Sequence, residues 1–427
     1  MLKDYLDSLE DQFESQAGFG SDWLKSFKLK SFNTFREIGF PISRKGNEKW
    51  KYTSVSPIVN NVFQVSQPKS VDIDLIKQVA PWSKDWYNVV FIDGYIDHDI
   101  SNLPNSGISI YSLNSAQDRI GHLTDVSDDG FAALNSAFLS DGLILSIEKS
   151  FDPNAVLNII YYNSGSNLEF NNPRLHITAQ EKSSSIVLEN YVGGGANVTL
   201  TNSVTEIELK PSAKMTHYRL MSESDDSFNI GYGRVKLSDD SSFDSSSFFH
   251  GANIGRYDLN VLIDGERAHC DLKGLYLTSD EQHLDNFINI DHSKPNSSSN
   301  LFYKGILSGK SRAVFGGTVL VRKEAQKTFS VQSDKNLILS DQAEVDSKPA
   351  LFIYADDVQC AHGASAGNID EDSVFYMRSR GIDLETASKL LIYGFADEII
   401  SQIEQIEFRD FIEDKFLESL PDYKFEF

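Results

Sequence analysis

The spacing of apolar side chains changes twice along the chain and divides it into three parts. In the first part, apolar residues recur at helical intervals, as at Leu6, Leu9 and Phe13. This periodicity predicts a mostly helical N-terminal domain over residues 1–85. The aromatic segment 48–53 belongs to this part, and we interpret it as core packing rather than as a ligand platform.

Residues 86–370 show short runs of β-branched and aromatic residues separated by small polar turns, for example 186–192 and 314–321. Many strands without intervening helices indicate an all-β sandwich, barrel or solenoid. A sandwich of this length would need two domains, and no linker divides the stretch. We therefore favour a β-solenoid, in which each coil contacts only its neighbours.

The helical period returns after residue 371 and predicts a helical C-terminal domain over residues 371–427. Asp383 is placed to cap a long helix, and Gly394 interrupts that helix at a cost of about 1 kcal/mol relative to alanine. The helix carries one continuous apolar stripe, formed by Leu384, Ala387, Leu391, Phe395, Ile399, Ile403 and Ile406. Two interpretations stay open, because the stripe either packs on the solenoid as a cap or leaves part of its surface for a partner.

The charge of the chain limits its partners. It has 39 Lys and Arg against 62 Asp and Glu, which gives a net charge of -23. Phosphate backbones and anionic lipids are bound by basic surfaces, so we expect neither nucleic acid nor a membrane as partner. The acidity instead favours basic protein partners or metal cations.

The cysteine content and the hydropathy indicate a compartment. Two cysteines cannot form a disulfide scaffold, which fits a reducing environment. The N-terminal residues lack the apolar core of a signal peptide, and no run of about 18 apolar residues is present to span a membrane. We therefore expect a soluble cytoplasmic protein.

Cys360 and His362 are the most informative candidates for chemistry. They lie two residues apart in a Gly- and Ala-rich segment, so in a strand their side chains point to the same face. Three interpretations stay open: a structural pair, a nucleophile with its base, or ligands of a metal or cluster. Two ligands do not complete a tetrahedral site, so a metal site here would be completed by a partner or by solvent.

Other candidates are less specific. His269 and Cys270 are adjacent and face opposite sides of a strand, whereas His283 and His292 lie in a segment with two aspartates. No P-loop pattern is present, so we do not expect nucleotide hydrolysis by that route. A carbohydrate-active β-helix is an alternative function, with clustered carboxylates as acid and base, at Asp239, Asp240, Asp356 and Asp357. A passive interaction protein without a metal role is a third.

Several segments carry a family resemblance, namely 326–332, 336–340, 349–353, 356–364 and 375–381. They resemble the SufB/SufD family of iron–sulfur cluster assembly scaffolds. The Cys-x-His-Gly-Ala form of the fourth segment is most similar to the SufD branch. The resemblance implies a mainly β fold, a right-handed parallel β-helix flanked by N-terminal and C-terminal helical domains. With the patterns above, it predicts domains at 1–85, 86–370 and 371–427.

The resemblance also implies a function. The chain would be a scaffold rather than an enzyme, and would act with a SufB-like subunit and a SufC-like ATPase in iron acquisition and nascent cluster formation. Its cargo would be iron or a nascent iron–sulfur cluster, held transiently and shared with the partner; nothing in the sequence identifies a flavin site. His362 matches the family histidine at the subunit interface, and Cys360 matches a family cysteine whose role is left open.

The resemblance further implies two docking surfaces. The SufB-like subunit would pair through the β-helix, and a homodimer would replace this pairing when that partner is missing. The ATPase would dock on the C-terminal helices, so that its ATP-driven closure rearranges the β-helix interface around His362. The predicted ATPase-binding residues are Leu384, Ala387, Leu391, Gly394, Phe395 and Ile399.

Overall fold

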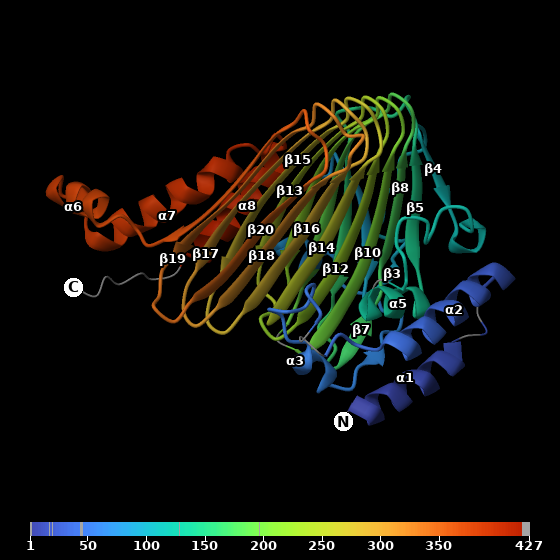
Figure 1. The fold of residues 1–427 in the computed structure, drawn as a ribbon. Coiled ribbons are helices and arrows are strands. Elements are labelled where there is room, and N and C mark those ends of the chain that lie inside the picture. Colours follow the sequence, from blue (N-terminus) through green and yellow to red (C-terminus); the bar gives the residue numbers. More distant parts are fainter. Residues whose placement is uncertain are drawn as a thin grey trace.

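The computed structural model describes residues 2–16, 18, 20–42, 46–127, 129–195 and 197–420. Its core is a parallel β-solenoid of about eight turns, in which two sheets face each other across a common interior (Figure 1). From β8 onward, successive strands alternate between the sheets, so each coil adds one strand to each sheet. The predicted mainly β fold, a parallel β-helix with helices toward both ends of the chain, is confirmed.

The first sheet runs in the order β20-β18-β16-β14-β12-β10-β8-β5-β4, with β1 and β7 at its side. Its strands are β1 (Gln64–Val65), β4 (Ile108–Tyr111), β5 (Gly142–Ile147), β7 (Glu169–Asn171), β8 (Arg174–Ala179), β10 (Thr199–Leu209), β12 (Phe228–Leu237), β14 (Ile254–Ile263), β16 (His283–His292), β18 (Arg312–Val321) and β20 (Glu344–Ile353). Its strand pairs are parallel except β4 with β5.

The second sheet runs in the order β21-β19-β17-β15-β13-β11-β9-β6-β2-β3. Its strands are β2 (Tyr87–Ile92), β3 (Tyr95–Ile96), β6 (Val156–Asn163), β9 (Ser184–Gly193), β11 (Lys214–Ser222), β13 (Ser242–His250), β15 (His269–Thr278), β17 (Ser298–Leu307), β19 (Phe329–Ile338) and β21 (Gln359–Gly367). Its strand pairs are parallel except β2 with β3.

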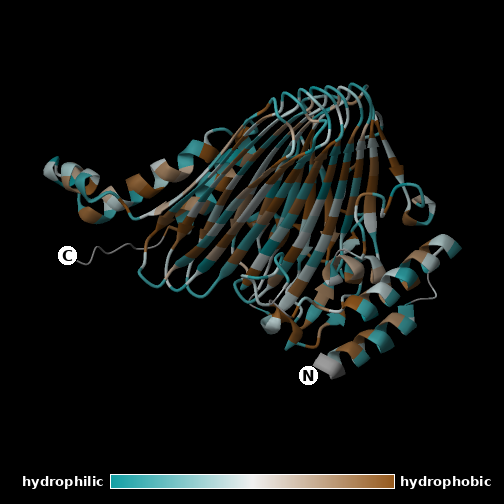
Figure 2. Cartoon of the chain, in the orientation of Figure 1, coloured by the Kyte–Doolittle hydropathy of each residue, from teal (hydrophilic) through white to brown (hydrophobic). Residues whose placement is uncertain are grey.

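Alternate side chains of each strand fill the interior between the sheets, and hydrophobic and polar residues alternate accordingly in Figure 2. Glycines make room for large rings in this interior. A Cβ atom at Gly274 would lie 2.1 Å from the ring of Tyr303, and one at Gly305 would lie 2.2 Å from the ring of Tyr276. The two pairs interlock in neighbouring coils, so these glycines serve close packing within continuous strands.

Three N-terminal helices pack on the outer face of the first sheet: α1 (Leu2–Gln16), α2 (Asp22–Ile38) and α3 (Ser56–Val59). The fourth, α4 (Ile73–Val79), lies on the second sheet, where Ile76 joins the cluster of Val90 and Ile160. Buried aromatic residues such as Phe13 and Phe32, which stack with their ring centroids 4.1 Å apart, form one cluster with Phe170 and Phe228 of the sheet. The helical period of the first 85 residues therefore marks a face that the solenoid covers.

One helix inside the solenoid region was not predicted. α5 (Gly130–Ala137) and the short 3-10 helix η1 (Leu113–Ser115) lie between β4 and β5. Every residue of α5 is buried, so the helix has no polar face and its sequence lacks an amphipathic period. The limits of the three domains stay a prediction.

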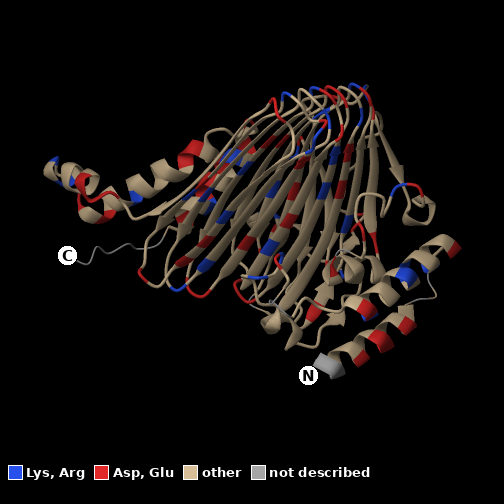
Figure 3. Ribbon diagram, in the orientation of Figure 1, with Lys and Arg blue, Asp and Glu red and all other residues tan. Residues whose placement is uncertain are grey.

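A row of buried charges crosses the outer face of the first sheet beneath the N-terminal segments (Figure 3). It alternates in sign over neighbouring strands and consists of Arg174, Glu206, Arg234, Asp258, Arg256 and Asp285. Arg174 Nη2 lies 2.6 Å from Glu206 Oε2, and Arg234 Nη1 lies 2.8 Å from Asp258 Oδ1. Because each charge has an opposite partner, the row can be buried without an isolated ion.

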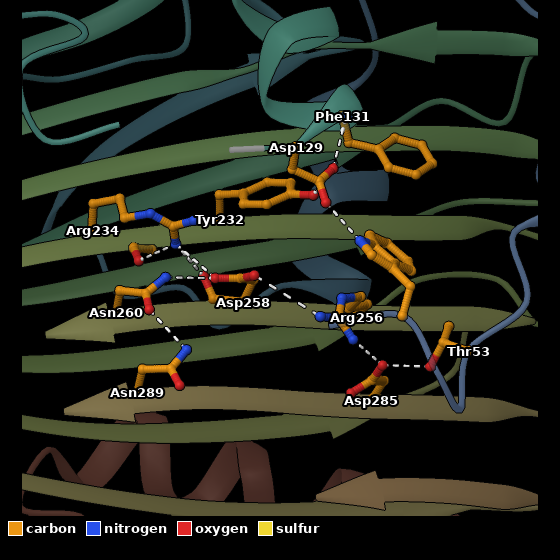
Figure 4. Close-up of polar contacts among 12 residues, drawn as sticks. Thr53, Asp129, Phe131, Tyr232, Arg234, Arg256, Asp258, Asn260, Asp285 and Asn289 are labelled. Atoms are coloured by element: carbon orange, nitrogen blue, oxygen red, sulfur yellow. Dashed lines mark hydrogen bonds and ion pairs between the residues drawn. The ribbon is translucent and has the colours of Figure 1, made fainter. Parts of the chain in front are cut away.

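The aromatic segment 48–53 covers the end of this row that holds Arg256 and Asp285 (Figure 4). The Trp50 indole donates a hydrogen bond of 2.6 Å to Asp129, and its ring lies 4.2 Å from the Arg256 guanidinium carbon. Thr53 donates to Asp285, which also pairs with Arg256. The segment thus attaches the N-terminal region to the solenoid through one charged and aromatic cluster.

Two of the C-terminal helices, α7 (Leu384–Ile400) and α8 (Ile406–Glu418), pack on the outer face of the second sheet. The helix before them, α6 (Glu371–Ser379), contacts α7. Phe408 of α8 contacts Tyr218 and Phe248, with ring centroids 5.1 and 5.8 Å away. α6 and the start of α7 project beyond the end of the solenoid that carries β20 and β21 (Figure 1).

Candidate functional site at the open end of the solenoid

The last coil of the solenoid is open. β21 pairs with β19 and β20 pairs with β18, and within the part of the chain that the structure describes each has a free second edge. Large apolar side chains are exposed around this end, notably Phe329, Phe352, Ile353 and Tyr354. A free strand edge offers unpaired backbone groups to another chain, and exposed apolar groups favour such pairing.

Cys360 and His362 lie on this last strand and face the interior side of the coil. They are in register with Ser330 and Gln332 of β19, which are buried at 0% and 1% exposure. Cys360 is half-buried and packs against the interior hydrophobic cluster. His362 points to the same face, as predicted, but is exposed because no further coil covers it.

The surroundings of the two side chains differ. Burial raises the pKa of the Cys360 thiol, and a hydrogen bond with the Ser330 backbone opposes this only in part. The side chain is therefore a neutral thiol at pH 7, and would lose its proton on binding a metal. A cation at this strand end would need at least one further ligand, because the described residues contain no group of three or more His, Cys, Asp and Glu side chains that could hold a metal ion.

Polar side chains line the interior directly beneath this coil. Asp334 is buried and accepts hydrogen bonds from Ser347, Asn336 and Tyr276, at 2.6, 2.7 and 3.2 Å. Burial raises the pKa of Asp334 to about 6. This layer is not predictable from the sequence pattern, because alternate polar residues in a strand such as β19 usually indicate a side that faces solvent.

The structure does not bring the other candidate histidines together. His283 and His292 lie at opposite ends of β16, and His292 is bound to Ser297 and Ser299 in the interior. His269 and Cys270 face opposite sides of β15, as expected, with Cys270 fully buried. The candidate carboxylates Asp239, Asp240, Asp356 and Asp357 are exposed in turns between coils.

The two cysteines should differ in reactivity, because alkylation requires the thiolate. Burial raises the pKa of Cys270 well above the ordinary range, and raises that of Cys360 in a half-exposed setting. We expect iodoacetamide to modify Cys360 in the folded chain, at a rate that increases with pH, and to modify Cys270 only after unfolding. Peptide mass spectrometry measures both. Equal modification of the two cysteines in the folded chain would contradict the placement of Cys270.

The stripe on α7 divides between buried and accessible positions. Ala387 and Ile399 are buried at 0% and 1% exposure, so in this conformation their side chains lie in the chain's own core. Leu384, Leu391 and Phe395 are half-buried against the cluster on the second sheet. Gly394 is exposed with open space around it, and further apolar side chains are exposed nearby, at Phe375, Tyr376 and Leu390.

One buried lysine ties α7 to the solenoid. Lys304 of β17 is 1% exposed and donates a 2.6 Å hydrogen bond to the Phe395 carbonyl oxygen. Its ammonium also lies 2.7 Å from Glu398 and 4.1 Å from the centroid of the Phe395 ring. Since β17 pairs with β19 and β19 with β21, displacement of α7 would act on the strands next to His362.

None of the helices in the described part of the chain is both long enough and apolar enough to cross a bilayer. The fold and the open end define a class of protein: a parallel β-solenoid that is flanked by helices and whose last coil has free strand edges.

Comparison with known proteins identifies the family. Residues 161–395 match the model described as SUF system FeS cluster assembly, SufBD core domain, and residues 2–159 match the SufBD protein N-terminal region. The chain therefore belongs to the SufBD family of iron–sulfur cluster assembly proteins, as its motifs indicated.

Individual relatives agree with this assignment. The chain is 28% identical over 363 residues to the iron-sulfur cluster assembly protein SufD of Escherichia coli, covering 83% of each protein. It is 28% identical over 381 residues to a SufBD family protein of Synechocystis, covering 85% of this chain and 84% of the relative. It is 23% identical over 419 residues to SufD of Bacillus subtilis, covering 94% of each.

Proposed function

We propose that this chain is the SufD-type scaffold subunit of an iron–sulfur cluster assembly complex. It contributes to iron acquisition and nascent cluster formation at an interface with a SufB-like subunit. The observation that carries the proposal is the open last coil, where Cys360 and His362 face inward at a free strand edge. The iron or cluster is cargo that the two subunits hold between them, so the chain acts as a scaffold and not as a catalyst.

Pairing through the β-helix follows from the incomplete ligand set. Imidazole and thiolate are both ligands that iron and its clusters accept. A second subunit that joins the free edges of β20 and β21 would cover the exposed Phe352 and Tyr354 and bring its own ligands to His362. A second copy of this chain would use the same edges when the SufB-like subunit is absent.

Docking of a SufC-like ATPase on the C-terminal helices accounts for the accessible side of α6 and α7. Phe375 is 74% exposed and Tyr376 is 59% exposed, and Gly394 permits close approach of another backbone. The half-buried Leu384, Leu391 and Phe395 adjoin this surface, whereas Ala387 and Ile399 would transmit motion through the core. The cytoplasmic location stays a prediction, as does the absence of nucleic-acid and membrane binding.

The experiment combines co-purification with anaerobic reconstitution. We expect the chain to co-purify with SufB-like and SufC-like subunits, and iron and sulfide to yield a cluster only when the SufB-like subunit is present. Phe352→Asp should prevent pairing with the SufB-like subunit, because it places a charge in the apolar rim of the open end. Leu29→Asp is the matched control, since Leu29 is 52% exposed on α2 and Phe352 is 51% exposed on β20.

Three results would count against the proposal. Unchanged pairing of Phe352→Asp would remove the open end from the interface. Assembly of the complex without any iron binding would favour a passive interaction scaffold. Binding of oligosaccharide by the isolated chain would favour the carbohydrate-active alternative, whose candidate Asp240 is engaged by Arg267 in an exposed turn.

A further inference from the structure

Gln332 lies one coil beneath His362, in the same inward-facing column of side chains. It is 1% exposed, and its Nε2 donates a 2.9 Å hydrogen bond to the Gly317 carbonyl oxygen on the opposite sheet. A Cβ atom at position 317 would lie 2.3 Å from this Nε2, so the glycine is what allows the amide to seat there. The contact fixes the orientation of the amide and directs its oxygen away from Gly317.

The Oε1 atom of Gln332 is buried and accepts no hydrogen bond within the described residues. An unpaired buried acceptor costs free energy, so a donor that reaches this oxygen would be stabilising. His362 is the residue in register above it, and no hydrogen bond restrains its imidazole in the described structure. The spacing of paired strands is about 4.8 Å, which is within reach of two side chains of this size.

The solenoid uses this kind of contact elsewhere. His217 belongs to the same inward column, and its Nδ1 lies 2.9 Å from the hydroxyl of Ser245, its in-register neighbour one coil on. His269 makes the same contact with Ser298, also at 2.9 Å. A hydrogen bond between an imidazole and its in-register neighbour in the adjacent coil is therefore compatible with the local geometry.

We infer that Gln332 is a positioning residue for His362. Its Oε1 accepts the N–H of one ring nitrogen, which fixes the tautomer and the ring orientation and leaves the other nitrogen free to bind iron. Metal-binding histidines are usually held in this way by an acceptor on the second nitrogen. The inference rests on the proposed function, because it assigns Gln332 a role only if His362 is a ligand.

Two substitutions separate positioning from packing. Gln332→Glu keeps the acceptor and loses the donor to Gly317, whereas Gln332→Met has a similar shape and loses both. A purely structural role through Gly317 predicts equal damage in the two variants. A positioning role predicts that Gln332→Glu retains metal affinity.

The measurement is anaerobic titration of the complete complex with Co²⁺ alone, followed by optical absorption. Relative to wild type, we expect Gln332→Met to weaken binding about 10- to 100-fold. Gln332→Glu should stay near the wild-type affinity. Leu301→Met, one coil deeper in the same column, is the packing control and should leave the affinity unchanged. Equal loss in Gln332→Met and Gln332→Glu would overturn the inference.

A double-mutant cycle decides whether Gln332 acts through His362, even if the glutamate variant does not fold. Gln332→Met should weaken Co²⁺ binding when His362 is present and have no additional effect in a His362→Ala background. An effect of the same size in both backgrounds would show that Gln332 acts independently of His362. If His362→Ala alone leaves the affinity unchanged, the proposed function fails and this inference fails with it; if His362→Ala weakens binding but the cycle shows no coupling to Gln332, only this inference fails.

Discussion

Replacing His362 with alanine should leave the complex assembled and abolish cluster formation on it. The side chain is exposed and makes no hydrogen bond within the described part of the chain, so its loss should change the free energy of unfolding by less than about 0.5 kcal/mol. Loss of a ligand should reduce the yield of cluster by at least about tenfold, since removal of a group that only supports a ligand costs that much. Anaerobic reconstitution, followed by absorption and iron content, measures the yield.

The matched control is His98→Ala. His98 is also exposed, but it follows β3 at the opposite end of the second sheet from β21. The control variant should assemble clusters at the wild-type yield. If His362→Ala also gave the wild-type yield in an intact complex, His362 would have no part in holding the cargo.

Replacing Arg256 with methionine should cause a large loss of stability. Arg256 is buried between Asp285 and Asp258 and lies against the rings of Trp50 and Phe287. Removal of the cation leaves the buried carboxylate of Asp285 without its main partner, whereas Asp258 keeps Arg234, and an unpaired buried charge costs about 3–5 kcal/mol. Urea denaturation followed by circular dichroism measures the change, and the N-terminal helices should detach first because Trp50 and Thr53 join the same cluster.

Two further variants test whether burial of the unpaired charge causes the loss of stability. Arg267→Met breaks an exposed pair with Asp240, in which the side chains are 55% and 45% exposed, and should cost at most about 1 kcal/mol. Adding Asp285→Asn to Arg256→Met should restore part of the lost stability, because it removes the carboxylate that Arg256→Met leaves unpaired. If Arg256→Met and Arg267→Met lowered the free energy of unfolding equally, burial of the charged row would have no influence on the cost of losing one of its partners.

The fold was predictable from the pattern of apolar and polar residues, because every coil of the solenoid follows the same rule of side-chain burial. Each coil buries alternate side chains, and stretches such as 186–192 and 314–321 show β-branched residues between turns without helical intervals. The N-terminal period at Leu9 and Phe13 likewise marks a face that packs on the first sheet. α5 was not predicted, because it is buried on every side. Its sequence therefore lacks the difference between an apolar and a polar face that identifies a helix.

The site was predictable only in part. The spacing of Cys360 and His362 predicted that their side chains lie on the same face of the strand, because side chains alternate between the two faces in any strand. The spacing could not indicate that this strand is the last, which is what makes His362 accessible. Gln332 and Asp334 were not predicted to lie in the interior, because polar side chains in a strand usually face solvent. In this solenoid, such side chains are buried and form hydrogen bonds with other polar groups.

The predicted partner surface on α7 shows a second limit of what an apolar periodicity can predict. An amphipathic stripe indicates that a helix is covered, but it does not identify what covers it. Ala387 and Ile399 pack on the chain's own second sheet, whereas the exposed Phe375 and Leu390 lie outside the periodic stripe. Only the positions of the sheets decide between these two surfaces.

We propose that the imidazole of His362 binds the nascent cluster at the open end of the solenoid. Pulsed electron paramagnetic resonance of the reduced complex tests it most directly, with this chain alone labelled by ¹⁵N-histidine. We predict a ¹⁵N coupling to the cluster that disappears in His362→Ala and persists in His98→Ala. A cluster that forms in the labelled complex without any ¹⁵N coupling would contradict the account.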